Sequence, residues 1–165
     1  MILLRNLKDE DIKEAHSLGN ICYPSDLHES LESFQWRFKI YPEGCRGAWV
    51  NDVLCGYIVA HIWKLNEIVY LNDDSYGLPK DADCMYIHDV AIHPLHHNKH
   101  LGSRLVSDII TLAVCKNIYN FAGVAIKSTE GYWKRWGFSV EREFYYTVNV
   151  PAFYMTCKKI PLWRG

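Results

Sequence analysis

The segment from residue 84 to residue 113 constrains the fold most, because a strand-like run is followed by a tight loop and a long amphipathic helix. Cys84 to Ile92 has the pattern of a strand, which His93-Pro94 ends. After the loop, apolar residues recur at the three- and four-residue spacing of a helix that buries one face. These residues are Leu101, Leu105, Val106, Ile109, Ile110 and Ala113. The unit favours a mixed α/β fold of the α+β type.

The rest of the chain alternates between strand-like and helix-like segments, without an internal repeat or a low-complexity linker. Further strands are predicted at residues 1–6, 48–50, 54–63, 121–126, 139–148 and 152–159, and further helices at 9–22, between 26 and 42, and at 129–136. Asn51-Asp52 is typical of a hairpin turn, and residues 72–83 carry the turn formers of an irregular loop. We therefore predict one domain over residues 1–165, with a largely antiparallel sheet of about seven strands and about four helices.

Composition excludes several classes of function. Lys and Arg total 18 against 19 Asp and Glu, which gives a net charge of -1, and no basic run could follow a nucleic-acid backbone. The apolar stretch after Met1 is too short for a signal peptide or a membrane span, so we expect a cytoplasmic protein with no membrane partner. The six cysteines are scattered without a Cys-x-x-Cys pair, so we expect reduced thiols and no metal.

The junction between the strand at 84–92 and the following helix is a candidate anion site. The first backbone N–H groups of a helix lack partners within the helix, and the helix dipole adds partial positive charge there. Gly102 would let the backbone approach a phosphate closely, while Lys99 and Arg104 add charge. The alternative is a solvated helix cap with no ligand.

At this junction the sequence resembles the GNAT superfamily of acetyltransferases, whose motif is Gln/Arg-x-x-Gly-x-Gly/Ala. The string His97-Asn98-Lys99-His100-Leu101-Gly102 occupies that motif, with His97 in place of Gln/Arg, His100 in place of the first Gly, and Gly102 retained. The later string Tyr132-Trp133-Lys134-Arg135-Trp136-Gly137-Phe138 is similar to the family's aromatic-Tyr-x-x-x-Gly-Phe. Together the two motifs extend the resemblance over nearly the whole chain.

The resemblance implies a GNAT-like fold and an acyl-CoA-dependent N-acetyltransferase that uses acetyl-CoA and no metal. It places the CoA pyrophosphate in the loop from His97 to Ser103. The residues implied to bind the cofactor are Val90, Ala91, Ile92, His97, Asn98, Lys99, His100, Leu101, Gly102, Ser103 and Trp133.

The run from Ile87 to Pro94 is most similar to the arylalkylamine N-acetyltransferase branch, which includes serotonin N-acetyltransferase. This similarity implies that His88 is the general base, directly or through water, and that Tyr86 occupies the branch's second histidine position. Strand alternation predicts that Tyr86 and His88 share one face while Ile87 and Asp89 point to the other.

The proton donor for the CoA thiolate is less well determined, because Trp133 stands where the family usually has Tyr and an indole N–H is not a practical acid. Tyr132 is the first candidate. Tyr145, Tyr146 and Tyr154 of the closing strands are alternatives, and so is departure of the thiolate without help.

The acceptor is predicted to be a primary amine on a small molecule, with an aryl or alkyl group as one possibility. Its pocket would be built from Tyr23, Pro24, Phe34, Trp36 and Trp63, with Asp26, Glu29 or Asp73 attracting the cation. Three alternatives stay open: a protein N-terminus or lysine as acceptor, a catalytically inactive CoA-binding regulatory domain, and a metal site formed by His93, His96, His97 and His100. The sequence leaves the oligomeric state open.

Overall fold

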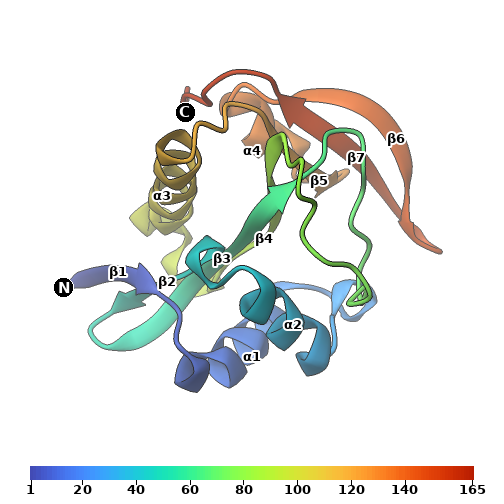
Figure 1. Ribbon diagram of the computed structural model, residues 1–165. Helices are drawn as coiled ribbons and strands as arrows, with labels where there is room; N and C mark the ends of the chain where they lie inside the picture. Colours follow the sequence, from blue (N-terminus) through green and yellow to red (C-terminus); the bar gives the residue numbers. More distant parts are fainter.

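The computed structural model describes all 165 residues and contains one seven-stranded sheet in the order β1-β2-β3-β4-β5-β7-β6 (Figure 1). Every neighbouring pair is antiparallel except β4 and β5, which are parallel. The predicted seven-stranded, largely antiparallel sheet is therefore confirmed. The strands are β1 (Ile2–Asn6), β2 (Cys45–Val50), β3 (Val53–Trp63), β4 (Cys84–Ile92), β5 (Phe121–Ile126), β6 (Ser139–Thr147) and β7 (Val150–Cys157).

The four predicted helices are also present, with changes at their ends. They are α1 (Ile12–Cys22), α2 (Leu31–Ile40), α3 (Leu101–Cys115) and α4 (Glu130–Arg135), and short 3₁₀ turns occur at Asp9–Asp11, Ser25–Leu27, Pro42–Gly44 and Pro94–Lys99. The second predicted helix begins later than expected, because the Ser30 side chain accepts a hydrogen bond from the Ser33 backbone N–H and caps α2 there. Residues 28–30 are consequently a short linker, and Glu29 lies within it.

Helices cover both faces of the sheet, with α1 and α2 on one face and α3 on the other (Figure 1). The apolar stripe predicted for α3 is buried as expected and packs with residues of β3 and β4. On the opposite face, Ile12, Ala15 and Leu18 of α1 pack against Tyr57 and Val59 of β3. Each fully buried aliphatic side chain contributes about 1.5–3 kcal/mol, so these two layers supply much of the driving force for folding.

The predicted β2–β3 hairpin is confirmed, and its turn explains the residues found there. Asn51 and Asp52 have φ values of 50° and 66°, as a type I′ turn requires at both central positions. Asn and Asp tolerate this left-handed conformation better than other residues with a Cβ.

None of the helices is long and apolar enough to cross a membrane.

A β-bulge interrupts β4 at His88. Val59 pairs with Asp89 and the next residue, Ala60, pairs with Ile87, so His88 is an extra residue in the ladder. The extra residue reverses the alternation, and Asp89 therefore lies on the same face as His88. The predicted placement of Asp89 on the opposite face is wrong for this reason.

The bulge also lies where β4 and β5 separate. The parallel pairing between these strands runs only from Met85 to Ile87 on β4, opposite Phe121 to Gly123 on β5. Beyond these residues both strands continue without pairing to each other. The facing strand edges therefore retain backbone groups that a ligand could bind.

Candidate active site

A cavity of about 580 Å³ lies where β4 and β5 separate, a size typical of small-molecule sites. Two sets of elements line the cavity from opposite sides. Part of β4 lies between the two sets, namely Ile87, His88, Asp89 and Val90. The residues of the first side, here called the α1–α2 side, are His16, Gly19, Asn20, Tyr23, Leu27, His28, Glu29, Phe34, Tyr57, Leu71 and Tyr146. Those of the α3–α4 side are Ile92, His97, His100, Gly102, Ser103, Val124, Ile126, Thr129, Tyr132, Trp133, Arg135 and Trp163.

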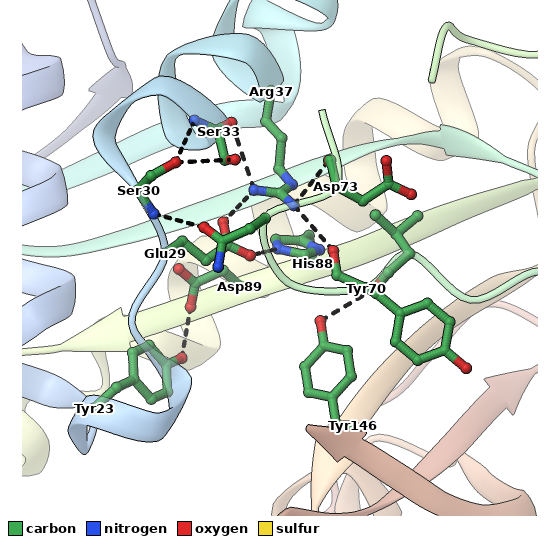
Figure 2. Close-up of polar contacts among 12 residues, drawn as sticks. Tyr23, Glu29, Ser30, Ser33, Arg37, Tyr70, Asp73, His88, Asp89 and Tyr146 are labelled. Atoms are coloured by element: carbon green, nitrogen blue, oxygen red, sulfur yellow. Dashed lines mark hydrogen bonds and ion pairs between the residues drawn. The ribbon is translucent and has the colours of Figure 1, made fainter. Parts of the chain in front are cut away.

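His88 is the histidine of β4 that lines the cavity, and a carboxylate orients it (Figure 2). Its Nε2 lies 2.8 Å from Oε1 of Glu29, while its Nδ1 is buried and has no hydrogen-bond partner in the protein. The other oxygen of Glu29 accepts a hydrogen bond from the guanidinium of Arg37, whose side chain is only 1% exposed. The Glu29–Arg37 ion pair thus supports one nitrogen of the imidazole, and the other nitrogen has no hydrogen-bond partner.

The charge of Glu29 is stabilised by both neighbours. Burial by itself would raise the pKa of Glu29, but His88 and Arg37 together outweigh burial and hold the pKa of this carboxyl below its ordinary value. Glu29 is therefore ionised at neutral pH. Both of its oxygens are already engaged, so it is a poor candidate for taking a proton from a substrate itself.

Asp89 forms a second polar cluster beside His88. The Tyr57 hydroxyl donates to Oδ2 of Asp89, and the Tyr23 hydroxyl lies 2.6 Å from Oδ1 and 2.7 Å from the Val90 carbonyl oxygen. Burial raises the pKa of Asp89, although the bonds from the two tyrosines act in the opposite direction. No cation is hydrogen-bonded to this carboxyl group.

On the α3–α4 side the cavity reaches the N-terminus of α3. His100 precedes the helix with φ of 55° and ψ of 24°, in the left-handed region, and Gly102 lies in the first turn of the helix. A Cβ added at Gly102 would have its nearest contact, the Tyr132 hydroxyl, at 3.4 Å, so packing alone does not require glycine there. The missing side chain instead leaves the helix N-terminus open to the cavity.

The left-handed conformation of His100 leads to a stability prediction. A residue with a Cβ pays roughly 1–2 kcal/mol in this region and glycine does not, so His100→Gly should raise the free energy of unfolding by about 1 kcal/mol. Urea denaturation measures the change. His100→Ala is the matched control, because it removes the same imidazole but keeps the Cβ. Equal stability of the two variants would contradict the prediction.

The sequence model of the acetyltransferase (GNAT) family matches residues 11–138, which is most of the chain. The chain belongs to the GNAT acetyltransferase family. The matched region includes β4, the α3 N-terminus and α4, the elements on which the cavity is built. A search of curated proteins found no sequence relative.

Solved structures agree with this GNAT fold. The loading GNATL domain of CurA from Lyngbya majuscula has a TM-score of 0.80 at 16% identity, with 94% of this chain and 96% of that chain covered. Naa50 from Arabidopsis thaliana, in complex with the bisubstrate analogue CoA-Ac-MVNAL, has a TM-score of 0.73 at 14% identity and coverage of 94% and 97%. The GphF GNAT-like decarboxylase in complex with isobutyryl-CoA has a TM-score of 0.76 at 15% identity and coverage of 93% and 97%. At these low sequence identities the structural similarity shows a shared fold and nothing more specific.

Most of the residues predicted to bind the GNAT cofactor line the cavity. These are Val90, Ile92, His97, His100, Gly102, Ser103 and Trp133. Four others do not line it. Ala91 and Leu101 are buried in the core, because Ala91 packs with the α1 layer and Leu101 belongs to the apolar stripe of α3, whereas Asn98 and Lys99 are exposed.

Of the predicted catalytic residues, some line the cavity and one does not. His88 and Tyr132 line the cavity, but Tyr86 is fully buried and its hydroxyl lies 3.3 Å from the Val69 backbone nitrogen. Although Tyr86 shares a face with His88, the loop between β3 and β4 covers it. Among the alternative tyrosines, Tyr146 lines the cavity, Tyr145 is exposed and Tyr154 is buried.

Of the residues predicted to bind the acceptor, Tyr23 and Phe34 line the cavity. Trp63 does not, because it packs against His61 and Tyr76 beneath the β3–β4 loop, and Pro24 is exposed outside the cavity.

The predicted set lacked Arg37 and Tyr57, and Glu29 was expected only as one of several acids near the amine. Arg37 could not be found by spacing, because a charged residue on a short helix usually faces solvent. The loop histidines form no metal cluster, and the structure has no group of three or more His, Cys, Asp or Glu that could hold a metal ion.

Proposed function

We propose that this protein is an N-acetyltransferase that moves the acetyl group of acetyl-CoA to a primary amine on a small molecule, with His88 as the general base. One observation carries the proposal: the unpartnered Nδ1 of His88 belongs to a residue that lines the same cavity as the loop predicted to bind the cofactor. A base and an activated acyl group held in one cavity satisfy the requirements of amine acetylation.

The residues on the α3–α4 side fit a CoA molecule. Backbone N–H groups at the α3 N-terminus, opened by Gly102, would hold its pyrophosphate. The edge of β4 from His88 to Ile92 has no partner on β5, and the backbone groups not already bonded to side chains, as the Val90 carbonyl is to Tyr23, would bind the amides of the CoA arm. When bound, acetyl-CoA supplies a thioester carbonyl as the electrophile.

The chemistry of the chain's own residues follows from their contacts. His88 Nδ1 accepts the proton that an ammonium group, with a pKa near 10, must lose before its nitrogen can attack. Attack on the thioester carbonyl forms the C–N bond, the C–S bond then breaks, and the nitrogen releases its second proton to solvent, from which Tyr132 would regain the proton that it gives to the sulfur. Tyr132 would give the departing sulfur a proton, because its hydroxyl has no hydrogen-bond partner and burial raises its pKa, which keeps the hydroxyl protonated until it reacts.

A small cationic acceptor suits the α1–α2 side. The Tyr146 hydroxyl donates to the Val69 carbonyl at 3.1 Å, and Asn72 accepts from the Ser30 N–H at 2.8 Å, so the β3–β4 loop is tied to both β6 and the linker before α2. These bonds favour an enclosed pocket with aromatic walls. Asp89, which has no cation bonded to it, would attract an ammonium group.

A peptide N-terminus is the second candidate acceptor, because the structurally similar Naa50 was solved with the analogue CoA-Ac-MVNAL. A free-thiol release assay with acetyl-CoA tests both, using arylalkylamines, other alkylamines, polyamines and short peptides as acceptors. Turnover of small amines supports the proposal, and turnover of peptides alone would replace it with the second candidate. Binding of acetyl-CoA without any turnover would support an inactive regulatory domain.

Gly102 provides a direct test of the cofactor loop. A leucine side chain at this position would project into the cavity, so Gly102→Leu should weaken CoA binding at least about tenfold, or 1.4 kcal/mol. The melting temperature should not fall, because leucine is the better helix former. Isothermal titration calorimetry with CoA measures the affinity. Leu112→Met, on α3 outside the cavity, is the control, and unchanged affinity in Gly102→Leu would exclude this loop as the CoA site.

A further inference from the structure

The geometry around His88 points to a role for two residues that the family motifs do not contain. We propose that Glu29 and Arg37 are positioning residues that fix the tautomer of His88, with the proton on Nε2 and the lone pair on Nδ1. This inference deepens the proposed function and rests on it for its catalytic consequence. The tautomer itself can be measured without any turnover.

The tautomer follows from the hydrogen-bonding capacity of the partners. An ionised carboxylate can only accept hydrogen bonds, so the 2.8 Å contact between His88 and Glu29 requires a hydrogen on Nε2. In the neutral imidazole the other nitrogen, Nδ1, then carries the lone pair. Nδ1 is buried and has no partner in the protein, so its lone pair is not committed to another protein group.

No other side chain competes for the imidazole. Tyr86 stacks on the His88 ring with centroids 6.4 Å apart, but its hydroxyl contacts Val69 instead. The other charged and titratable groups of this region are Asp89, which follows His88 in β4, Arg37 of α2, His61 of β3 and Tyr146 of β6, which lines the same cavity. None of them is hydrogen-bonded to His88, so the contact with Glu29 decides where the proton sits.

Arg37 fixes Glu29 in turn and connects it to the wall of the cavity (Figure 2). Its Nη1 donates to Glu29, and its Nη2 donates to the carbonyl oxygens of Tyr70 and Asp73 at 3.3 and 3.4 Å. The loop between these two carbonyls carries Leu71, which lines the cavity. The buried guanidinium of Arg37 thus holds both the Glu29 carboxylate, which is bonded to His88, and the loop that carries Leu71.

The variant Glu29→Gln gives a sharp test, because the amide keeps the shape of the carboxylate but has one oxygen and one nitrogen. Arg37 has only donors, so the amide oxygen must face Arg37 and the amide NH₂ must face His88. Nε2 would then have to accept a hydrogen bond, and the proton would move to Nδ1. The base nitrogen would be blocked while the packing stayed almost unchanged.

The experiment is ¹⁵N NMR of protein labelled at histidine, with the His88 signals identified by their loss in His88→Gln. Wild type should show a protonated Nε2, Glu29→Gln a protonated Nδ1, and Glu29→Asp, which keeps the charge, the wild-type tautomer. A protonated Nδ1 in wild type would overturn the proposal even if Glu29→Gln failed to fold. An unchanged tautomer in folded Glu29→Gln would also overturn it.

The catalytic consequence is measured separately. With an amine that wild type acetylates, Glu29→Gln should lower kcat at least about a hundredfold and leave the dissociation constant of CoA unchanged. Full activity of a variant whose tautomer has inverted would remove Nδ1 from the mechanism. If wild type acetylates no amine, the proposed function fails, and the tautomer measurement still decides whether Glu29 and Arg37 position His88.

Discussion

Replacing His88 by glutamine should lower kcat for acetyl transfer by about 10²–10⁴, the range supplied by a positioned general base. Glutamine has no basic nitrogen, so the ammonium form of the acceptor would have to lose its proton to water. The deficit should be largest at neutral pH and shrink at high pH, where more of the amine is already neutral. A pH series of the thiol-release assay measures this, and calorimetry should show unchanged affinity for CoA.

His96→Gln is the matched control for this experiment. His96 also carries an imidazole, but it lies on the 3₁₀ turn before α3 and does not line the cavity. Its replacement should leave the rate unchanged. If His88→Gln were as active as wild type at every pH, His88 would not be the base and the proposed mechanism would have to be abandoned.

Removal of Arg37 should have the largest effect on stability. Arg37→Ala leaves the Glu29 carboxylate buried without its cation and leaves two loop carbonyls without a donor, so we expect a loss of about 3–5 kcal/mol in the free energy of unfolding. Urea denaturation at pH 7 measures it. The double variant Arg37→Met and Glu29→Gln removes both charges together and should recover at least half of the loss. A loss below about 1 kcal/mol in Arg37→Ala would contradict the structural role of the pair.

The Glu29–Arg37 pair should make the protein less stable as the pH falls into the acidic range. The pKa of Glu29 in the folded protein lies below its ordinary value of 4.5, so the folded state favours the ionised carboxylate. Its contribution is fully present above pH 4.5 and is lost as the pH falls through the lower, folded pKa. The double variant has no carboxylate at this position and should lack this part of the acid-induced destabilisation.

The sequence predicts the layers of this fold well, because an element that buries one face carries apolar residues at a regular spacing. The α3 stripe from Leu101 to Ala113 is the clearest case, and every residue predicted to be buried is buried. The Asn51-Asp52 turn is also predictable from neighbouring residues alone, because its two central positions need positive φ angles, which Asn and Asp adopt more readily than most residues. The strand–loop–helix order predicts an anion site at the start of α3, and the resemblance to the GNAT family adds the predictions that this site holds CoA and that His88 is the base.

The remaining parts of the site depend on long-range contacts that no local pattern records. The partners of Arg37 lie in the linker before α2 and in the β3–β4 loop, so its burial cannot be inferred from α2 alone. Tyr86 is on the predicted face of β4, but the loop at Val69 closes over it. The specific link to the arylalkylamine branch stays a prediction, because the family match and the structural neighbours do not select a branch.

The bulge at His88 has a consequence for aligning this chain with its relatives. A comparison that treats β4 as a regular strand would displace Asp89 to Ile92 by one position and assign core residues to the ligand side. A structure-based alignment needs a single-residue gap opposite His88 in any relative whose fourth strand is unbroken. Deleting this one residue would leave a strand of ordinary pleat, with one polar side chain fewer facing the cavity.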